Sequence, residues 1–346
     1  MSERIYPMSV KDAADKICGK RALIFCHVNP DGDAIGTATA LAELLRLTGG
    51  DGRVVTPSPV PERLSFMIGG TDTSYTDGME SDYELILTVD TASPSQLGEL
   101  SFIADKTDIS FDHHGNCTLY SPHVLYPNSA AAGLIVLDLF LELEASGKIT
   151  GDSSGMLRRI YAALASDTGS FKYSNTNAAA FTAASEICKR LADAPIGGNA
   201  PIDSMTAADI SAALFDSVTK KDVAVRRLSY NNMRYVCDGL IALSVITARE
   251  MADNGLVMDD LGGMVDCVRS IKNTVVGIAL KDAGDGVWRG SSRANVDFDV
   301  SVPASKLSGG GHKRAAGFKV QADSAESAVA IVEKIFGEAL SAEGLC

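Results

Sequence analysis

Histidine and aspartate residues cluster near the start of the chain, at His27, Asp31 and Asp33, directly after the apolar run 22–26. A helical pattern follows over residues 34–46, so the segment is expected to form a strand, a loop and a helix. In open α/β sheets, ligands bind in the crevice beyond the carboxyl ends of the strands. Carboxylates with one imidazole suit Mn²⁺ or Mg²⁺ better than the thiolate-rich sets of structural zinc. Taken alone, the segment is equally compatible with a polar turn whose aspartates cap the next helix.

Two further polar motifs follow predicted strands. Asp90 ends one apolar run, and Asp112-His113-His114 ends the next. Adjacent side chains leaving a strand point in different directions, so one imidazole can bind a metal while the other faces substrate and Asp112 orients a ring. Taken by itself, Asp90 is better explained as a cap of the helix after it. Three of the five histidines of the chain lie in the first and third motifs, and this concentration favours a metal or catalytic site.

Asp167 completes the candidate set. It comes at the end of a predicted helix over residues 154–165, and Gly169 allows the backbone to leave that helix beside it.

Apolar strands alternate with helical patterns as far as residue 191, which predicts an α/β fold with a mostly parallel sheet covered by helices. The strands are expected at 22–26, 53–56, 84–89 and 108–111, and the helices at 34–46, 130–144, 154–165 and 178–191. Two prolines and two glycines within 192–201 mark a linker, where hinge motion is expected. We therefore predict a catalytic domain at 1–191, a linker at 192–205 and a smaller α/β substrate-binding domain at 206–346, with a cleft between the domains.

The predicted second domain carries a candidate anion site. Three consecutive glycines can present backbone N–H groups to a phosphate, and cationic side chains stand beside them. The residues concerned are Arg293, Gly309, Gly310, Gly311, His312, Lys313 and Arg314.

The composition limits the choice of partners. The 346 residues carry a formal net charge of −13, which argues against a protein that coats long duplex nucleic acid but permits a short anionic substrate. Seven scattered cysteines without C-x-x-C spacing disfavour a disulfide framework and a zinc knuckle. The first residues carry no signal pattern, and the most apolar segment, 130–143, is interrupted by Asp138. We therefore expect a cytoplasmic protein without a membrane partner.

Taken together, these motifs resemble the four motifs of the DHH phosphoesterase superfamily. The run Gly309-Gly-Gly-His312 with Ala315-Ala-Gly-Phe318 resembles the signature of the DHH-associated domain of the first type (DHHA1). The compact two-domain layout and the segment 166–176 look most like the nanoRNase/pAp phosphatase subfamily, in which pAp is 3′-phosphoadenosine 5′-phosphate. Two departures from that subfamily are Lys172, where arginine is common, and Thr37, where serine is common.

The resemblance implies a centre of two Mn²⁺ ions, with Mg²⁺ as the other candidate. One ion would be held by His27, Asp31 and Asp90, and the second by Asp33, Asp90, His113 and Asp167. His114 would face the scissile phosphate, Asp112 would support the histidines, and Arg293 and His312 would bind substrate. Such a pair of ions activates a bridging water for in-line displacement at phosphorus.

The expected activity is hydrolysis of short oligoribonucleotides to mononucleotides, with pAp as a second candidate substrate. The enzymatic alternative is hydrolysis of cyclic di-AMP or its linear product pApA. The non-enzymatic alternative is a nucleotide-binding sensor, which should have lost at least one metal ligand. Short single-stranded RNA or a small nucleotide is therefore the expected partner, and a homo-oligomer remains open.

Overall fold

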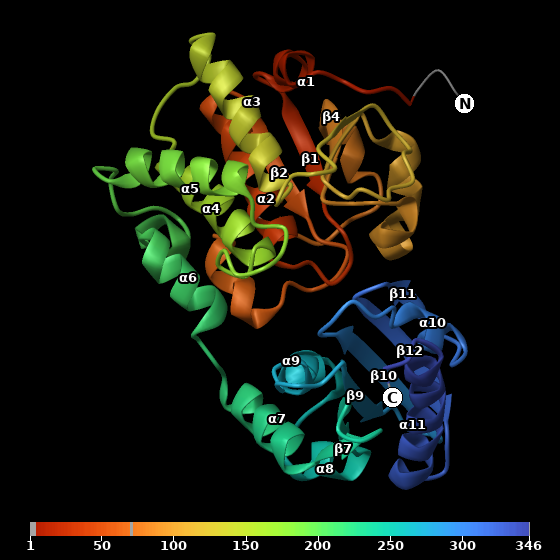
Figure 1. Ribbon diagram of the computed structural model, residues 1–346. Coiled ribbons are helices and arrows are strands. Elements are labelled where there is room, and N and C mark those ends of the chain that lie inside the picture. Colours follow the sequence, from red (N-terminus) through yellow and green to blue (C-terminus); the bar gives the residue numbers. More distant parts are fainter. Residues whose placement is uncertain (1–4, 70–71, 346) are drawn as a thin grey trace. The chain divides into compact units, whose positions relative to one another are not determined.

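The computed structural model describes residues 5–69 and 72–345. It divides into two compact units, one ending at Ser217 and the other beginning at Val218, and each unit is described by itself (Figure 1). No helix within these described ranges is both long and apolar enough to cross a bilayer.

A parallel six-stranded sheet forms the centre of the first unit, in the order β3-β2-β1-β4-β5-β6. Its strands are β1 (Arg21–Phe25), β2 (Asp51–Val55), β3 (Asp72–Thr73), β4 (Leu85–Val89), β5 (Ile109–Asp112) and β6 (His123–Leu125). Central strands of such a sheet are buried on both faces, and accordingly every residue of β4 is buried. The expected parallel α/β sheet is confirmed.

Helices cover both faces of this sheet. They are α1 (Val10–Ile17), α2 (Gly32–Leu47), α3 (Gly133–Ala145), α4 (Ser154–Asp167), α5 (Ala178–Leu191) and α6 (Ala207–Phe215), with the 3₁₀ segments η2 (Glu62–Met67), η3 (Met79–Asp82), η4 (Pro94–Lys106) and η5 (Pro201–Ser204). Ile24 and Leu87 face the α-helical core, whereas Leu23 and Ile86 face the opposite side, where they pack with Leu97 of η4. Alternate residues of a strand point to opposite faces, so each strand contributes to both cores.

The second unit contains a mixed six-stranded sheet in the order β11-β12-β10-β9-β8-β7, in which only β8 and β9 pair in parallel. Its strands are β7 (Met233–Val236), β8 (Ile241–Ile246), β9 (Val276–Asp282), β10 (Val287–Ala294), β11 (Gly310–His312) and β12 (Ala315–Gln321). Its helices are α7 (Lys220–Asn231), α8 (Ala248–Asp253), α9 (Met264–Arg269), α10 (Ser301–Ser305) and α11 (Ala325–Ala342), with the 3₁₀ segment η6 (Met258–Gly263). The helix α11 packs on one face, and α7 and α9 pack on the other (Figure 1).

The segment predicted as a linker, 192–205, packs within the first unit. Arg158 of α4 donates hydrogen bonds to the carbonyl oxygens of Pro195, at 3.0 Å, and Met205, at 2.9 Å. Ile210 of α6 is also fully buried in the core of this unit. The structure therefore assigns residues 206–217, which the sequence analysis gave to the second domain, to the first unit. The irregular residues 217–219 connect α6 to α7.

Candidate metal centre

The polar side chains singled out in the first unit converge at the carboxyl edge of the parallel sheet. His27 follows β1, Asp90 follows β4, Asp112 is the last residue of β5, and His113 and His114 follow it. The helices supply the rest, because Asp31 caps the start of α2, Asp33 lies in its first turn, and Asp167 is the last residue of α4. Parallel strands end at one edge, which explains how positions far apart in the sequence come together.

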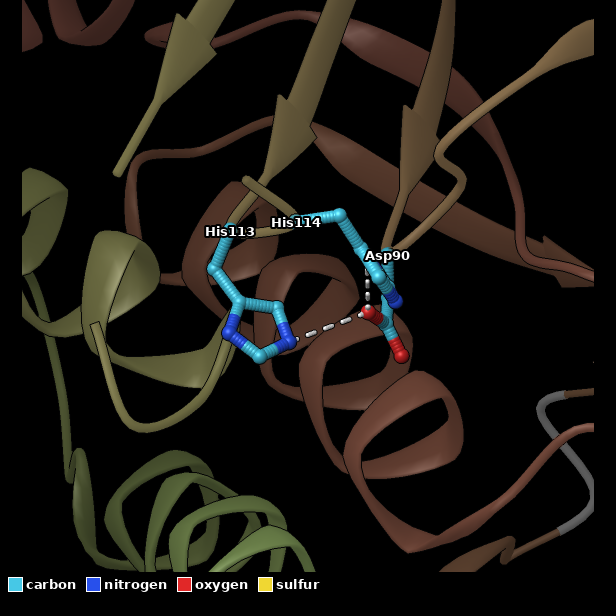
Figure 2. A group of neighbouring side chains, drawn as sticks. All are labelled: Asp90, His113 and His114. Atoms are coloured by element: carbon cyan, nitrogen blue, oxygen red, sulfur yellow. Dashed lines mark ion pairs between the residues drawn. The ribbon is translucent and has the colours of Figure 1, made fainter. Parts of the chain in front are cut away.

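Asp90 lies at the middle of the group. Its Oδ2 is 3.6 Å from Nε2 of His27, and its Oδ1 is 3.5 Å from Nε2 of His113 and 3.6 Å from Nδ1 of His114. Figure 2 shows His113 and His114 both paired with one oxygen of this carboxylate. Oδ2 of the buried Asp90 thus faces His27, whereas Oδ1 faces His113 and His114.

The backbone of Asp90 is left-handed, with φ of 50°. This conformation is unusual for a residue other than glycine and persists only where the surroundings enforce it. The Asp90 N–H donates to the carbonyl oxygen of Phe111 at 2.9 Å, and the Thr91 hydroxyl donates to the carbonyl oxygen of Val89 at 2.8 Å. The bend at the end of β4 is held by these bonds, and it directs the Asp90 carboxylate among the histidines.

Asp33 is fully buried and is oriented from three sides. It accepts hydrogen bonds from the Thr37 hydroxyl at 2.8 Å and from the N–H groups of Ala132, at 2.7 Å, and Gly133, at 3.1 Å. The remaining close contact is Nε2 of His113, 3.5 Å from its Oδ2. Threonine at position 37 therefore keeps the hydroxyl donor that serine would supply.

Asp167 approaches the same histidine from α4, with its Oδ2 3.7 Å from Nε2 of His113. The Asn175 side-chain amide donates to the carbonyl oxygen of Asp167 at 3.0 Å, which ties the end of the helix to the following loop. The His113 Nδ1 lies 3.1 Å from the carbonyl oxygen of Ser129. This contact leaves Nε2 of His113 directed at the carboxylates.

Asp112 orients the histidine pair. Its Oδ1 accepts from the N–H of His113 at 2.8 Å and lies 2.8 Å from Nδ1 of His114. A carboxylate on Nδ1 fixes the ring, so that the opposite nitrogen, Nε2, is directed away from Asp112. The His114 side chain is 40% exposed, whereas that of His113 is 13% exposed, so His114 is the more accessible of the two.

The charges of the cluster shift several pKa values. Burial lowers the pKa of His27, but Asp90 and Asp31 outweigh it and raise that pKa to about 9. Burial likewise opposes protonation of His113, whose pKa is nevertheless raised to about 10 by Asp90 and Asp33. Burial raises the pKa of Asp90, yet its contacts with the two histidines hold that pKa well below its ordinary value. Burial raises the pKa of Asp167 to about 6.

The donor set fits divalent cations. Oδ1 of Asp90 and Oδ2 of Asp112 are buried oxygens that accept no hydrogen bond among the described residues. A buried carboxylate oxygen without a donor is costly, and a cation would compensate it. Three sets of side chains have donor atoms within 4.8 Å of one another: Asp90, His113 and His114; His27, Asp31 and Asp90; Asp33, His113 and Asp167. Oxygen-rich sets with imidazole are suited to Mn²⁺ or Mg²⁺.

In the second unit, the predicted glycines lie on an edge strand or directly before it. Gly310 and Gly311 belong to the edge strand β11, which pairs with β12. A Cβ at Gly309 would lie 2.2 Å from the carbonyl oxygen of Gly317, so this glycine permits close packing of the two segments. Lys313 and Arg314 both pair with Asp297.

Arg293 lies on β10, is half-buried, and donates to the carbonyl oxygen of Ser292 at 3.0 Å. The side chain of His312 lies outside the described part of the structure, although its backbone pairs with Ala315.

Thr37, Ser129 and Asn175 orient the cluster but were not among the predicted site residues. For Thr37, the spacing of four residues from Asp33 on one helix was an available signal. Ser129 acts through a backbone carbonyl, which no sequence pattern marks.

Fold and site together define a two-unit α/β protein with a candidate divalent-metal centre at the edge of its parallel sheet. Residues 21–164 match the family model described as "DHH family, N-terminal domain", and residues 240–338 match the one described as "DHHA1 domain". The chain therefore contains a DHH-family N-terminal domain and a DHHA1 domain, and the predicted resemblance is confirmed.

Three similar proteins illustrate the relationship. The chain is 27% identical over 300 residues to the "Bifunctional oligoribonuclease and PAP phosphatase NrnA" of Thermus thermophilus, covering 85% of this chain and 82% of that protein. It is 24% identical to the "Probable bifunctional oligoribonuclease and PAP phosphatase NrnA" of Streptococcus mutans, covering 85% of this chain and 88% of that protein. An exopolyphosphatase-related protein from Bacteroides fragilis shares the fold, with a TM-score of 0.81 at 22% identity, over 95% of this chain and 96% of that one.

Proposed function

We propose that this protein is a metal-dependent phosphoesterase that hydrolyses short oligoribonucleotides to mononucleotides and pAp to AMP. The observation that carries the proposal is the Asp90 carboxylate, whose two oxygens face His27 on one side and His113 on the other. The names of the relatives from Thermus thermophilus and Streptococcus mutans support the choice of substrates.

In this proposal the cluster holds two Mn²⁺ ions, with Mg²⁺ as the alternative. His27, Asp31 and Asp90 would hold one ion, and Asp33, Asp90, His113 and Asp167 would hold the other. When bound, such ions lower the pKa of water and stabilise negative charge on phosphoryl oxygens.

The residues around the ions then have distinct tasks. Asp112 fixes the His114 ring through Nδ1 and raises the pKa of that imidazole, which favours a protonated His114. A protonated, partly exposed imidazole would donate a charge-assisted hydrogen bond from Nε2 to a phosphoryl oxygen as charge develops. The carbonyl oxygen of Ser129, 3.1 Å from Nδ1 of His113, keeps that ring in place. Arg293 of the second unit would bind a substrate phosphate.

Hydrolysis of cyclic di-AMP or pApA uses the same centre, so substrate assays must separate the two activities. Purified protein with Mn²⁺ is offered a 5′-phosphorylated RNA dinucleotide, pAp, cyclic di-AMP and pyrophosphate side by side, and released phosphate and mononucleotides are measured. Turnover of the dinucleotide and pAp is expected. Turnover of cyclic di-AMP alone would replace the proposal with a cyclic-dinucleotide phosphodiesterase. If the metal-bound protein hydrolysed none of the four compounds, a nucleotide sensor would be favoured.

A further inference from the structure

Three cations lie directly opposite one another on adjacent strands of the second unit. Lys281 of β9 pairs in register with Arg289 of β10, which pairs in register with Lys319 of β12. Neighbouring strands are about 4.8 Å apart, so the three backbone positions span only about 10 Å. Like charges in directly opposite positions destabilise a sheet. Their presence in a chain of net charge −13 therefore calls for a compensating anion.

Within the described ranges, no carboxylate forms an ion pair with any of these three cations. Among the described residues, the ion pairs of the second unit involve Lys221, Arg234, Arg249, Lys313 and Arg314 instead. Burial lowers the pKa of Lys281, and Arg293 and Arg289 lower it further. The three cations thus repel one another and have no salt-bridge partner in the part of the chain that the structure describes.

A pocket of about 550 Å³ opens over these side chains. All three cations line it, together with Ser291 and a single acid, Asp259. Gly317 also lines it, and a Cβ there would meet only the carbonyl oxygen of Gly290 at 3.8 Å, so the space above this glycine is free. Cations, a hydroxyl and open backbone are the features by which proteins bind phosphate.

We infer that Lys281, Arg289 and Lys319 form a phosphate subsite that takes a backbone phosphate of a single-stranded oligonucleotide, at a linkage other than the one hydrolysed. The nature of this ligand rests on the proposed function, whereas the subsite itself rests on the cation register and the pocket. Such a subsite would favour substrates of several nucleotides over pAp, because pAp has no remote phosphodiester.

The test compares two charge-matched variants. Arg289→Gln/Lys319→Gln removes the two exposed cations of the subsite. Arg249→Gln/Lys334→Gln removes an exposed arginine and an exposed lysine from α8 and α11, outside the pocket lining. Binding of a fluorescein-labelled, 5′-phosphorylated RNA pentanucleotide to the full-length protein in EDTA is followed by anisotropy over a range of salt concentrations.

For single-stranded nucleic acid, each phosphate that a protein neutralises adds about 0.7 to the slope of log affinity against log salt. The subsite binds one phosphate, so the subsite variant should have a slope smaller by about 0.7, and a fourfold rise in salt should weaken its binding about 2.6-fold less than that of the wild type. The control variant should keep the wild-type slope. Equal slopes for both variants would overturn the inference.

A steric variant gives an independent measurement. Gly317→Val fills the pocket without removing a charge, and a β-branched residue suits its strand position. We expect weaker pentanucleotide binding, and wild-type affinity would contradict the assignment. In kinetics, the KM for the pentanucleotide should rise more than that for pAp in the charge variant. If the wild type binds the pentanucleotide with the expected salt slope but hydrolyses neither substrate, the proposed function fails and the subsite stands.

Discussion

At the scale of single residues, the candidate metal centre depends on Asp90, whose carboxylate contacts His27 through one oxygen and His113 and His114 through the other. Asp90 is 2% exposed and lies in a left-handed backbone conformation, so its side chain has little freedom to turn. Its neighbours His27 and His113 carry raised pKa values because of it. Changing this carboxylate should therefore alter both halves of the site at once.

Asp90→Asn should remove metal binding and lower turnover by more than about a hundredfold, because outer-shell partners of metal sites alone cost up to that much. The shape of the side chain is retained, so folding should survive. Calorimetric titration with Mn²⁺ and hydrolysis of pAp measure the two effects. The control is Asp77→Asn, in an exposed segment, which should behave as wild type. Tight binding of two equivalents of Mn²⁺ by the Asp90 variant would refute the shared-ligand assignment.

Metal affinity should depend steeply on pH. Without metal, the pKa values of His27 and His113 are about 9 and about 10, so both rings are protonated at pH 7. A metal ion binds neutral imidazole and must displace these protons. The logarithm of the apparent affinity should therefore rise by up to about two per pH unit between pH 6.5 and 8.5.

The same shifts have a consequence for the metal-free fold. The pKa of His27 in the folded state lies above its ordinary value of 6.5, so protonation of this ring stabilises the fold. This stabilisation is complete below pH 6.5 and is lost as the pH rises through about 9.

His27→Gln should reduce the pH slope of Mn²⁺ affinity by about one, since one proton fewer is displaced. Mn²⁺ titrations of wild type and variant across this pH range measure both slopes, and a pH-independent affinity would count against displacement of imidazole protons.

At the scale of elements, the strands and helices near the site were largely predictable. The apolar run 84–89 and the helical pattern 34–46 correspond to β4 (Leu85–Val89) and α2 (Gly32–Leu47), because burial on a parallel sheet leaves a continuous apolar signature. The sequence analysis predicted no strand at Gly310 and Gly311, which form β11, since their pairing depends on β12 rather than on local preference. The cation row of β9, β10 and β12 was not predictable, because strand register is a tertiary property.

Gly36 is one of two glycines of α2 that face α4, the other being Gly32. A Cβ at Gly36 would lie 2.8 Å from the carbonyl oxygen of Arg159 and 2.9 Å from Cβ of Ala163. The two helices carry Asp33 and Asp167, so separating them should disturb the site. Gly36→Val should lower the free energy of unfolding by about 1–3 kcal/mol through overpacking and weaken Mn²⁺ binding.

Thermal unfolding and metal titration check this expectation. Gly262→Val is the matched control, since a Cβ at that position would meet nothing within 4 Å apart from its chain neighbours. If Gly36→Val bound Mn²⁺ as tightly as the wild type, helix spacing would not determine the site.

At the scale of the whole chain, composition alone misplaced the boundary between the units. The prolines and glycines of 192–205 indicated a linker, yet buried contacts hold this segment on the first unit. Arg159 of α4 forms an ion pair with Asp203, and their side chains are only 5% and 10% exposed. The partner of a buried charge lies far away in the sequence, so a local count of glycine and proline does not reveal it.

Limited proteolysis should therefore cut between α6 and α7 first. Residues 217–219 are exposed and irregular. Residues 195–199 are exposed and irregular as well, but hydrogen bonds from Gly197 to Asp203 and from Arg158 to Pro195 hold them in place. Exposed backbone without secondary structure is the preferred site of proteolytic nicking. Brief digestion with proteinase K should give fragments that end or begin within 216–219, identified by mass spectrometry, and the N-terminal fragment should retain Mn²⁺ binding because every residue of the candidate centre lies in it. A variant with Asp203→Asn leaves Arg159 without its partner and should redirect early cleavage to 192–205. First cleavage of the wild type in 192–205 would instead restore that segment as the connection between independently folded parts.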